Sequence, residues 1–243
     1  MAAAAALAPG HARAPATAPY FPHFPRSCVR ADFTSLGSPV RAEFCQAKAG
    51  KGTVAVVVLH GCGGFSTFDH RLATTLPDFG IATLDIDYFG LTPPPNRRGF
   101  CRGGGNVAAA MPTWIQIVND AGTMLRKRRH ATAVGVAGWS LGGDLALAVT
   151  SASPPSRRSF AATAGFSADS LAASHPTWLP PTILLFGGTE KPPLRQAFVL
   201  RHKLRSRLPL ALYIYAGGTH DWQGRQGAAG IGAAATFLRK HLR

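Results

Sequence analysis

From residue 53 onwards, continuous apolar runs alternate with amphipathic stretches, which is the pattern of alternating strands and helices. Two of the runs, 53–60 (TVAVVVLH) and 81–87 (IATLDID), are apolar throughout or nearly so and predict strands buried on both faces. Further strands are expected at 132–138, 160–167, 182–188 and 211–217. Apolar residues at helical spacing predict helices at 67–79, 111–128, 141–151, 193–207 and 230–242. This order indicates an α/β protein with a mostly parallel sheet and helices on both faces.

The segment before this alternation predicts an antiparallel hairpin. Residues 28–36 and 40–46 both read as strands, and the turn Leu36-Gly37-Ser38-Pro39 lies between them. Cys28 and Cys45 are about equally distant from the turn, so the hairpin would place them opposite each other. They are then either joined in a disulfide, which needs an oxidising compartment, or buried as free thiols. The four cysteines contain no C-x-x-C pair, so a zinc site is not expected.

Residues 1–26 are dominated by alanine and proline, and we expect a disordered tail there. A degenerate signal peptide is the alternative, because small-residue steps imitate a cleavage site although the positively charged start is missing. Residues 27–243 are expected to form one domain, since no internal repeat or linker divides them. If the first residues are a tail, the protein is predicted to be cytoplasmic. If they are a signal peptide, it is predicted to be periplasmic or secreted.

Composition favours a sizeable core, with 46% hydrophobic and only 15% charged residues. No apolar run reaches the roughly 18 residues that a membrane helix needs, so we expect a soluble protein with no membrane partner. The formal net charge is +15, and basic residues cluster at 126–129 and 201–207. Because no RNA- or DNA-binding motif accompanies them, we interpret them as solvated helix faces and predict no nucleic-acid partner.

One short motif carries the candidate chemistry. The stretch Gly138-Trp139-Ser140-Leu141-Gly142 has the pattern G-x-S-x-G, with a predicted strand before it and a predicted helix after it. This is the context of a nucleophile elbow, a tight turn that needs glycine two residues away on either side. The helix N-terminus below the serine favours developing negative charge. Ser140 is therefore the candidate nucleophile, and a plain N-cap serine in a glycine-rich turn is the alternative.

A serine hydroxyl needs a base, and the expected order along the chain is serine, acid, histidine. Of the nine histidines, His220 directly follows the last predicted strand. Three acids lie between Ser140 and His220, namely Asp144, Asp169 and Glu190. Asp144 lies on the helix behind the nucleophile, whereas Glu190 follows a predicted strand at a Gly-Gly-Thr turn. We predict that Glu190 orients His220, with Asp169 as the alternative.

Acyl transfer also needs donors for the oxyanion. We expect one from the backbone N–H of Leu141 and one from the N–H of Cys62, in the glycine-rich loop 60–64 (HGCGG) after the first buried strand. The expected borders of the substrate pocket are His60, Gly61 and Trp139, although His60 is interpreted mainly as a brace for its loop. The irregular stretch 88–106 is expected to complete the pocket.

Five segments together resemble the α/β-hydrolase fold and, within it, the dienelactone hydrolase family: VVVLHGCGGF, FGIATLDIDYFG, GVAGWSLGGDLAL, TILLFGGTEKPPL and GGTHDW. The resemblance covers roughly residues 28–243. It implies hydrolysis of esters or lactones through a covalent acyl-enzyme. It also shows three departures. The best-known members use a cysteine nucleophile where this chain has Ser140, and usually an aspartate where it has Glu190. Their carboxylate beside the oxyanion loop and their arginine after the DIDYFG segment match Gly61 and Leu91, so dienelactone is not the expected substrate.

These features predict a serine hydrolase that cleaves a carboxylic ester or lactone of small-molecule size, without a metal or organic cofactor. One alternative is a peptidase or acyl-aminoacyl hydrolase of the same fold. Such enzymes usually carry an extra propeller or a larger cap, for which 243 residues leave no room. The other alternative is a non-catalytic binding module on a hydrolase scaffold.

Overall fold

The computed structural model describes residues 28–48, 53–92, 106–151, 159–168, 178–204 and 210–242. The predicted tail, most of the irregular stretch, Cys101 and Asp169 lie outside the described residues. The strands are β1 (Cys28–Arg30), β2 (Phe33–Ser35), β3 (Ser38–Val40), β4 (Ala42–Cys45), β5 (Thr53–Leu59), β6 (Ile81–Ile86), β7 (Ala131–Trp139), β8 (Thr163–Phe166), β9 (Thr182–Gly187) and β10 (Leu210–Tyr215). The helices are α1 (Thr67–Thr75), continued by the 3₁₀ helix η1 (Leu76–Phe79), α3 (Val107–Arg129), α4 (Leu141–Ser151), α6 (Lys191–Leu204) and α7 (Gly224–His241).

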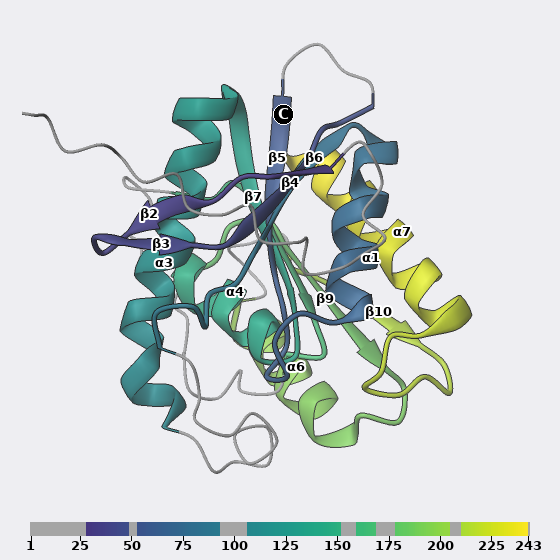
Figure 1. Cartoon of the computed structure of the whole chain (residues 1–243). Helices are drawn as coiled ribbons and strands as arrows, with labels where there is room; N and C mark the ends of the chain where they lie inside the picture. Colours follow the sequence, from purple (N-terminus) through teal and green to yellow (C-terminus); the bar gives the residue numbers. More distant parts are fainter. Residues whose placement is uncertain are drawn as a thin grey trace, which may run out of the picture.

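Eight strands form one twisted sheet in the order β1-β4-β6-β5-β7-β8-β9-β10 (Figure 1). The six strands from β6 to β10 in this order are parallel, and β4 and β1 continue the sheet in antiparallel pairing. The small β2–β3 hairpin is separate. The chain thus has the mostly parallel sheet with helices on both faces that the alternation of strands and helices predicted. Parallel strands end at the same edge of the sheet, so the loops after β5, β7, β8, β9 and β10 lie along one edge.

Helices cover both faces of the sheet, because each central strand is apolar on both sides. On one face, α3 and α4 bury residues such as Trp114 and Leu145 against β4, β5 and β6. On the other face, α1 and α7 pack Phe68 and Leu238 against β5 and its neighbours (Figure 1). Helix α6 packs on β9 through Ala197 and Leu200, together with residues of α4. No helix within the described parts of the chain is long and apolar enough to cross a membrane.

The N-terminal hairpin forms as predicted, but each of its two predicted strands is divided in two. The chain turns at Leu36 and Gly37, both in the left-handed region at φ 48° and 78°, and the short strands β2 and β3 pair next to the turn. The outer halves, β1 and β4, pair in the same register and belong to the edge of the main sheet. Cys28 lies opposite Cys45 in that pairing, and the two form a disulfide with a Cα–Cα distance of 4.0 Å. Of the two predicted states of these cysteines, the structure has the disulfide.

Two helices begin a full turn or more before the predicted residue. Helix α3 starts at Val107 rather than 111, because the Asn106 side chain accepts a hydrogen bond from the Ala109 N–H and caps the first turn. Helix α7 starts at Gly224 rather than 230. Its glycines allow close packing: a Cβ added at Gly227 or Gly230 would collide with Trp222.

Candidate active site

Ser140 lies on a strained turn between β7 and α4. Its φ is 54°, in the left-handed region that non-glycine residues rarely occupy and that is found at functional turns. A Cβ added at Gly138 would overlap the Gly142 carbonyl, and one at Gly142 would overlap the carbonyls of Leu59 and His60. The turn therefore requires both glycines of the motif, as predicted for a nucleophile elbow.

The elbow is fixed to the next strand and to its own helix. The Ser140 N–H donates to the Phe166 carbonyl at the end of β8, at 2.8 Å. Its carbonyl accepts from the Asp144 N–H at 3.0 Å, in the first turn of α4. Only 8% of Ser140 is exposed. The serine thus lies at the N-terminus of α4, where the unpaired N–H groups of the first turn favour negative charge.

Glu190 and His220 form a hydrogen-bonded pair. Glu190 follows β9 and His220 follows β10, and the His220 Nδ1 lies 2.9 Å from the Glu190 Oε1. The carboxylate is 6% exposed, whereas the imidazole side chain is 39% exposed. A carboxylate only accepts, so the Nδ1 of His220 carries the proton of this hydrogen bond, and Nε2 is the basic nitrogen of the neutral imidazole. The acid and base predicted from chain order are in contact.

The loops that carry this pair are held by side chains that the sequence analysis did not single out. The Gln226 amide accepts from the Thr219 N–H at 3.1 Å and donates to the Thr219 carbonyl at 2.7 Å. The Thr189 hydroxyl donates to the Gly218 carbonyl at 2.7 Å and joins the loop after β9 to the loop after β10. Gln226 belongs to the early part of α7, which the sequence pattern had not assigned to a helix.

Trp139 connects the nucleophile turn to the histidine loop. Its indole N–H donates to the His220 carbonyl at 3.0 Å, and the two rings lie 5.7 Å apart between centroids. A Cβ added at Gly61 would lie 2.9 Å from the Trp139 ring, so the glycine-rich loop after β5 also packs on this indole. Trp139, which precedes Ser140 in the chain, therefore contacts both the loop of His220 and the glycine-rich loop after β5.

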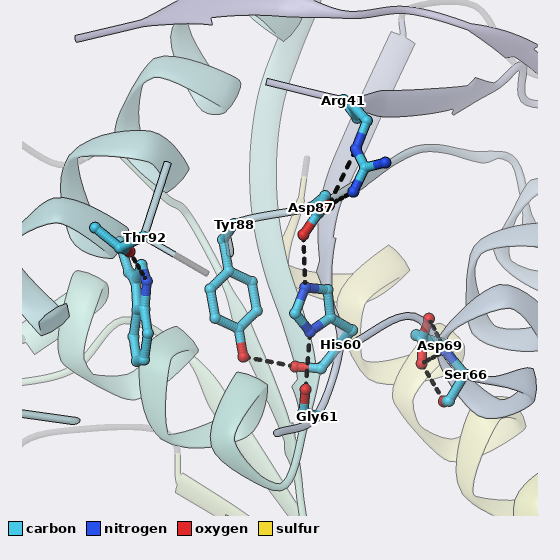
Figure 2. A network of polar contacts seen from close by, with 9 residues as sticks. Arg41, His60, Gly61, Ser66, Asp69, Asp87, Tyr88 and Thr92 are labelled. Carbon is cyan, nitrogen blue, oxygen red and sulfur yellow. Dashed lines mark hydrogen bonds and ion pairs between the residues drawn. The ribbon is translucent and has the colours of Figure 1, made fainter. Parts of the chain in front are cut away.

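His60 is fully buried at the start of the glycine-rich loop, where it contacts the segment that follows β6 (Figure 2). Its Nδ1 donates to the Gly61 carbonyl at 2.8 Å, and its Nε2 faces the Asp87 Oδ1 at 3.5 Å. Tyr88 stacks on the ring at 4.1 Å and donates its hydroxyl to the His60 carbonyl at 2.9 Å. These contacts are those of a brace for the loop, the main role expected for His60.

Asp87 is the charged partner in this network. Burial acts to raise its pKa, but hydrogen bonds and the charges of His60 and Arg41 outweigh burial, so the pKa of Asp87 lies below its usual value. The Arg41 Nε donates to Asp87 at 3.1 Å, and a second guanidinium nitrogen does so as well (Figure 2). In the same view, Ser66 and Asp69 form the capping box that begins α1. The glycine-rich loop is thus fixed at both ends.

Cys62, whose N–H is the predicted second oxyanion donor, is disulfide-bonded. The loop also contains a tight turn in which the Gly64 N–H donates to the Gly61 carbonyl at 3.1 Å.

Among the described residues, no group of three or more histidine, cysteine or acidic side chains is arranged to hold a metal ion.

The sequence pattern did not predict two buried acids, which lie away from the edge of the sheet that carries Ser140 and His220. Glu43 on β4 lies directly opposite Asp85 on β6. Burial, together with the charge of Asp32, raises the pKa of Glu43 to about 7, and burial raises that of Asp85 well above its usual value. Neither Asp85 oxygen has a hydrogen-bond partner among the described residues. The prediction that IATLDID forms a buried strand was confirmed, but the sequence pattern did not explain the buried acid Asp85 within it.

Comparison with solved structures places the fold among α/β-hydrolase enzymes. A dienelactone hydrolase from Anabaena variabilis superposes with a TM-score of 0.74 at 19% identity, over 90% of this chain and 100% of that one. A hyperthermophilic esterase from the archaeon Pyrobaculum calidifontis gives a TM-score of 0.68 at 14% identity, over 88% and 86% of the two chains. The thermophilic carboxylesterase EstE1 from a metagenomic library gives 0.68 at 15% identity, over 90% of each chain.

The sequence itself has no such counterpart. No protein-family model matches the chain, and no curated protein matches it. At these identities the likeness establishes the fold, and the chemistry has to be argued from the site.

Proposed function

We propose that this protein is a serine hydrolase that cleaves a carboxylic ester or a lactone, with Ser140 as nucleophile, His220 as base and Glu190 as the acid. The observation that carries the proposal is the Glu190–His220 pair at 2.9 Å, on a loop whose backbone is bonded to the residue before Ser140. That arrangement supplies the base and its orienting group beside an elbow serine, as nucleophilic catalysis requires.

The reaction follows from the direction of these hydrogen bonds. The Nε2 of the neutral His220 imidazole removes the Ser140 proton as Oγ attacks the carbonyl carbon. The resulting imidazolium donates its new proton to the leaving alcohol, while Glu190 balances its charge. Water, activated by the same Nε2, then cleaves the acyl-enzyme and releases the acid. The proposed chemistry uses groups of the protein and water, without a metal or organic cofactor.

The oxyanion donors proposed are the backbone N–H groups of Leu141 and Cys62. Leu141 is the first residue of α4, so its N–H is unpaired within the helix. Gly61 packs on Trp139, which brings the Cys62 loop to the nucleophile turn. Trp139 and Gly61 therefore border the proposed substrate pocket, and His60 acts from beneath by bracing the loop.

A small-molecule ester is favoured over a peptide. The solved structures similar to this chain include a dienelactone hydrolase and esterases. A panel of p-nitrophenyl esters, simple lactones and peptide p-nitroanilides separates the two: faster turnover of the anilides would favour the peptidase alternative.

The compartment proposed is an oxidising one, periplasmic or extracellular. The Cys28–Cys45 disulfide supports this alternative over the cytoplasmic one, because cytosolic thiols are normally kept reduced.

The function is tested with p-nitrophenyl acetate and a fluorophosphonate probe. We expect the purified protein to hydrolyse the ester and to be labelled once per chain, and Ser140→Ala to lose labelling and about 10³-fold or more in kcat. Ser35→Ala is the matched control, since Ser35 is equally buried but lies on β2, where it bonds to Asp120. A wild-type protein that is never labelled would support the non-catalytic binding module instead.

A further inference from the structure

The two oxygens of the Glu190 carboxylate have different partners. Oε1 accepts from the His220 ring, as described above. Oε2 accepts from the Gly187 N–H at 2.6 Å and from the Ser167 hydroxyl at 2.8 Å. Hydrogen bonds to an ionised acceptor are stronger than neutral ones, so these two donors hold the carboxylate in one orientation.

Ser167 is an unusual residue in its own right. It directly follows β8, is fully buried, and has a φ of 47° in the left-handed region. Ser140, which follows the neighbouring strand β7, has the same kind of backbone conformation and donates its N–H to Phe166, the residue before Ser167. A strained backbone at a buried serine indicates that the surroundings hold its hydroxyl in place.

Trp222 determines which way the Ser167 hydroxyl points. The indole N–H of Trp222 lies 2.9 Å from the Ser167 Oγ. An indole nitrogen can only donate, so this bond uses a lone pair of the hydroxyl. The hydroxyl proton is then available for Glu190, and every bond in the series has one direction: Trp222 donates to Ser167, Ser167 donates to Glu190, and His220 donates to Glu190.

Trp222 is itself held rigidly. It is fully buried, and its ring meets Phe166 edge-on with centroids 5.2 Å apart. The guanidinium of Arg71 on α1 donates to its carbonyl at 2.6 Å. The glycine at 230 on α7 leaves room for the ring. The indole is thus held in place by α1, α7 and β8, so its hydrogen bond gives the Ser167 hydroxyl a fixed orientation.

We infer that Ser167, oriented by Trp222, is a positioning residue for the acid of the proposed triad. This inference rests on the proposed function and deepens it. Ser167 occupies the second carboxylate oxygen, which leaves the first for His220 and keeps the base in its productive tautomer. The extra methylene of a glutamate, compared with an aspartate, lets one carboxylate reach both the His220 ring and the buried Ser167.

The test compares Ser167→Ala, Ser167→Cys and Trp222→Phe by steady-state hydrolysis of p-nitrophenyl acetate between pH 5 and 9. For Ser167→Ala we expect kcat to fall about 10- to 100-fold with KM nearly unchanged, because Ser167 touches the acid and not the substrate. Ser167→Cys keeps a weak donor and recovers part of that loss. Trp222→Phe keeps the hydroxyl but not its orientation, so we expect a smaller loss of about 3- to 10-fold.

The pH profile separates positioning from simple destabilisation. Without the Ser167 donor, the charge on Glu190 is less dispersed and attracts the imidazolium of His220 more strongly. The acidic limb of kcat/KM should therefore move to higher pH, by about half a unit or more. A variant that is merely less stable would lose active protein without moving this limb.

Two variants elsewhere provide matched controls. Ser35→Ala removes another buried serine that donates to a carboxylate, Asp120, at 2.7 Å. Phe33→Leu changes another buried aromatic side chain, which lies on β2, outside the main sheet. Both should lower the melting temperature to a similar extent as the site variants and leave kcat and the pH profile unchanged.

The inference is overturned if Ser167→Ala and Trp222→Phe resemble their controls in kcat and in the pH profile while the wild-type protein is active and labelled by the fluorophosphonate. If the wild-type protein is neither active nor labelled, the proposed function fails and the inference fails with it. Should Ser167→Ala not fold, Trp222→Phe and Ser167→Cys carry the same comparison, with a shifted acidic limb supporting the inference and an unshifted limb overturning it.

Discussion

The indole N–H of Trp139 donates to the backbone carbonyl of His220 at 3.0 Å, so the residue before the candidate nucleophile holds the loop that carries the candidate base. The two residues are 81 positions apart in the chain, and the register of β7 with the strands beside it brings them together. One hydrogen bond thus couples the two loops whose relative position decides whether proton transfer is possible.

Replacement of Trp139 by phenylalanine tests this coupling. Trp139→Phe keeps an aromatic ring against Gly61 but loses the bond to His220. We expect kcat for p-nitrophenyl acetate to fall about 10-fold, since a loosely held base spends less time in the reactive geometry. The measurement is a Michaelis–Menten series beside Phe33→Leu, a buried aromatic residue on β2, and equal activity of the two variants would contradict the coupling.

Glu190→Gln tests the tautomer of His220. A glutamine can present its amide N–H to Nδ1, which places the imidazole proton on Nε2 and removes the base. The corresponding change of aspartate to asparagine in a serine protease keeps the geometry but gives the wrong tautomer and costs about 10⁴-fold in kcat, and we expect a loss of about 10²- to 10⁴-fold here. The Glu190→Gln variant should still fold and keep Ser140 in its turn, and circular dichroism and thermal unfolding of the variant provide this control. Activity within a few-fold of wild type would assign the acid elsewhere, with Asp169 as the next candidate.

Much of this edge of the sheet could be read from local sequence. G-x-S-x-G between a strand and a helix has few conformations other than the observed elbow, and the glycines at 138 and 142 are required by overlap with their own neighbours. The order of serine, acid and histidine then followed from parallel topology, because successive strands end at one edge. The structure brings Glu190 and His220 into contact, whereas their catalytic roles remain a proposal.

The residues that hold this site in place could not be read in the same way. Ser167 and Gln226 act through contacts across 23 and 7 residues of chain, and nothing in their local sequence distinguishes them from ordinary polar residues. The early turns of α7 were missed because their glycines lower helix propensity, whereas the packing of Trp222 requires them. The roles of Ser167 and Gln226 and the start of α7 therefore depend on tertiary contacts, which local propensity does not predict.

The glycines of the elbow give a sharp prediction on stability. Gly142→Ala would force its Cβ into the carbonyls of Leu59 and His60, so we expect little or no folded protein. Gly232→Ala is the control, because a Cβ there meets nothing within 4 Å. In the middle of α7 that substitution should raise the free energy of unfolding by up to about 1 kcal/mol. Urea denaturation of the two variants and the wild type measures both effects, and a stably folded Gly142→Ala would contradict the geometry of the turn.

The Cys28–Cys45 disulfide closes a loop of 17 residues at the edge of the sheet. Replacing both cysteines by serine should lower the free energy of unfolding by about 3 kcal/mol, most of it through the entropy of the unfolded chain. Since Cys62 is also disulfide-bonded, the double variant isolates this bond better than a reductant does. Activity of the folded variant should be unchanged, because β1 is at the far edge of the sheet from β10. An unaltered denaturation midpoint would show that the bond contributes no stability.

The buried pair of Glu43 and Asp85 predicts how stability depends on pH. The pKa of Glu43 is raised by burial from 4.5 to about 7, so the folded state keeps its proton over a range in which the unfolded state has lost it. The folded state then binds more protons, and this contribution to stability is fully present below about pH 4.5 and falls as pH rises through 7. Asp85, whose pKa is also raised, acts in the same direction.

Glu43→Gln removes the titration while keeping the size of the side chain. Relative to wild type, the variant should gain stability with rising pH and reach an advantage of about 3 kcal/mol at pH 8, or roughly 6–12 °C in melting temperature. At pH 5, where Glu43 is protonated in the folded state, the difference should be much smaller. Thermal unfolding in matched buffers between pH 5 and 8 measures it, with Asp78→Asn as the control because Asp78 is a half-exposed acid paired with Lys48. A difference between Glu43→Gln and wild type that stays constant over this range would mean that Glu43 does not titrate in it.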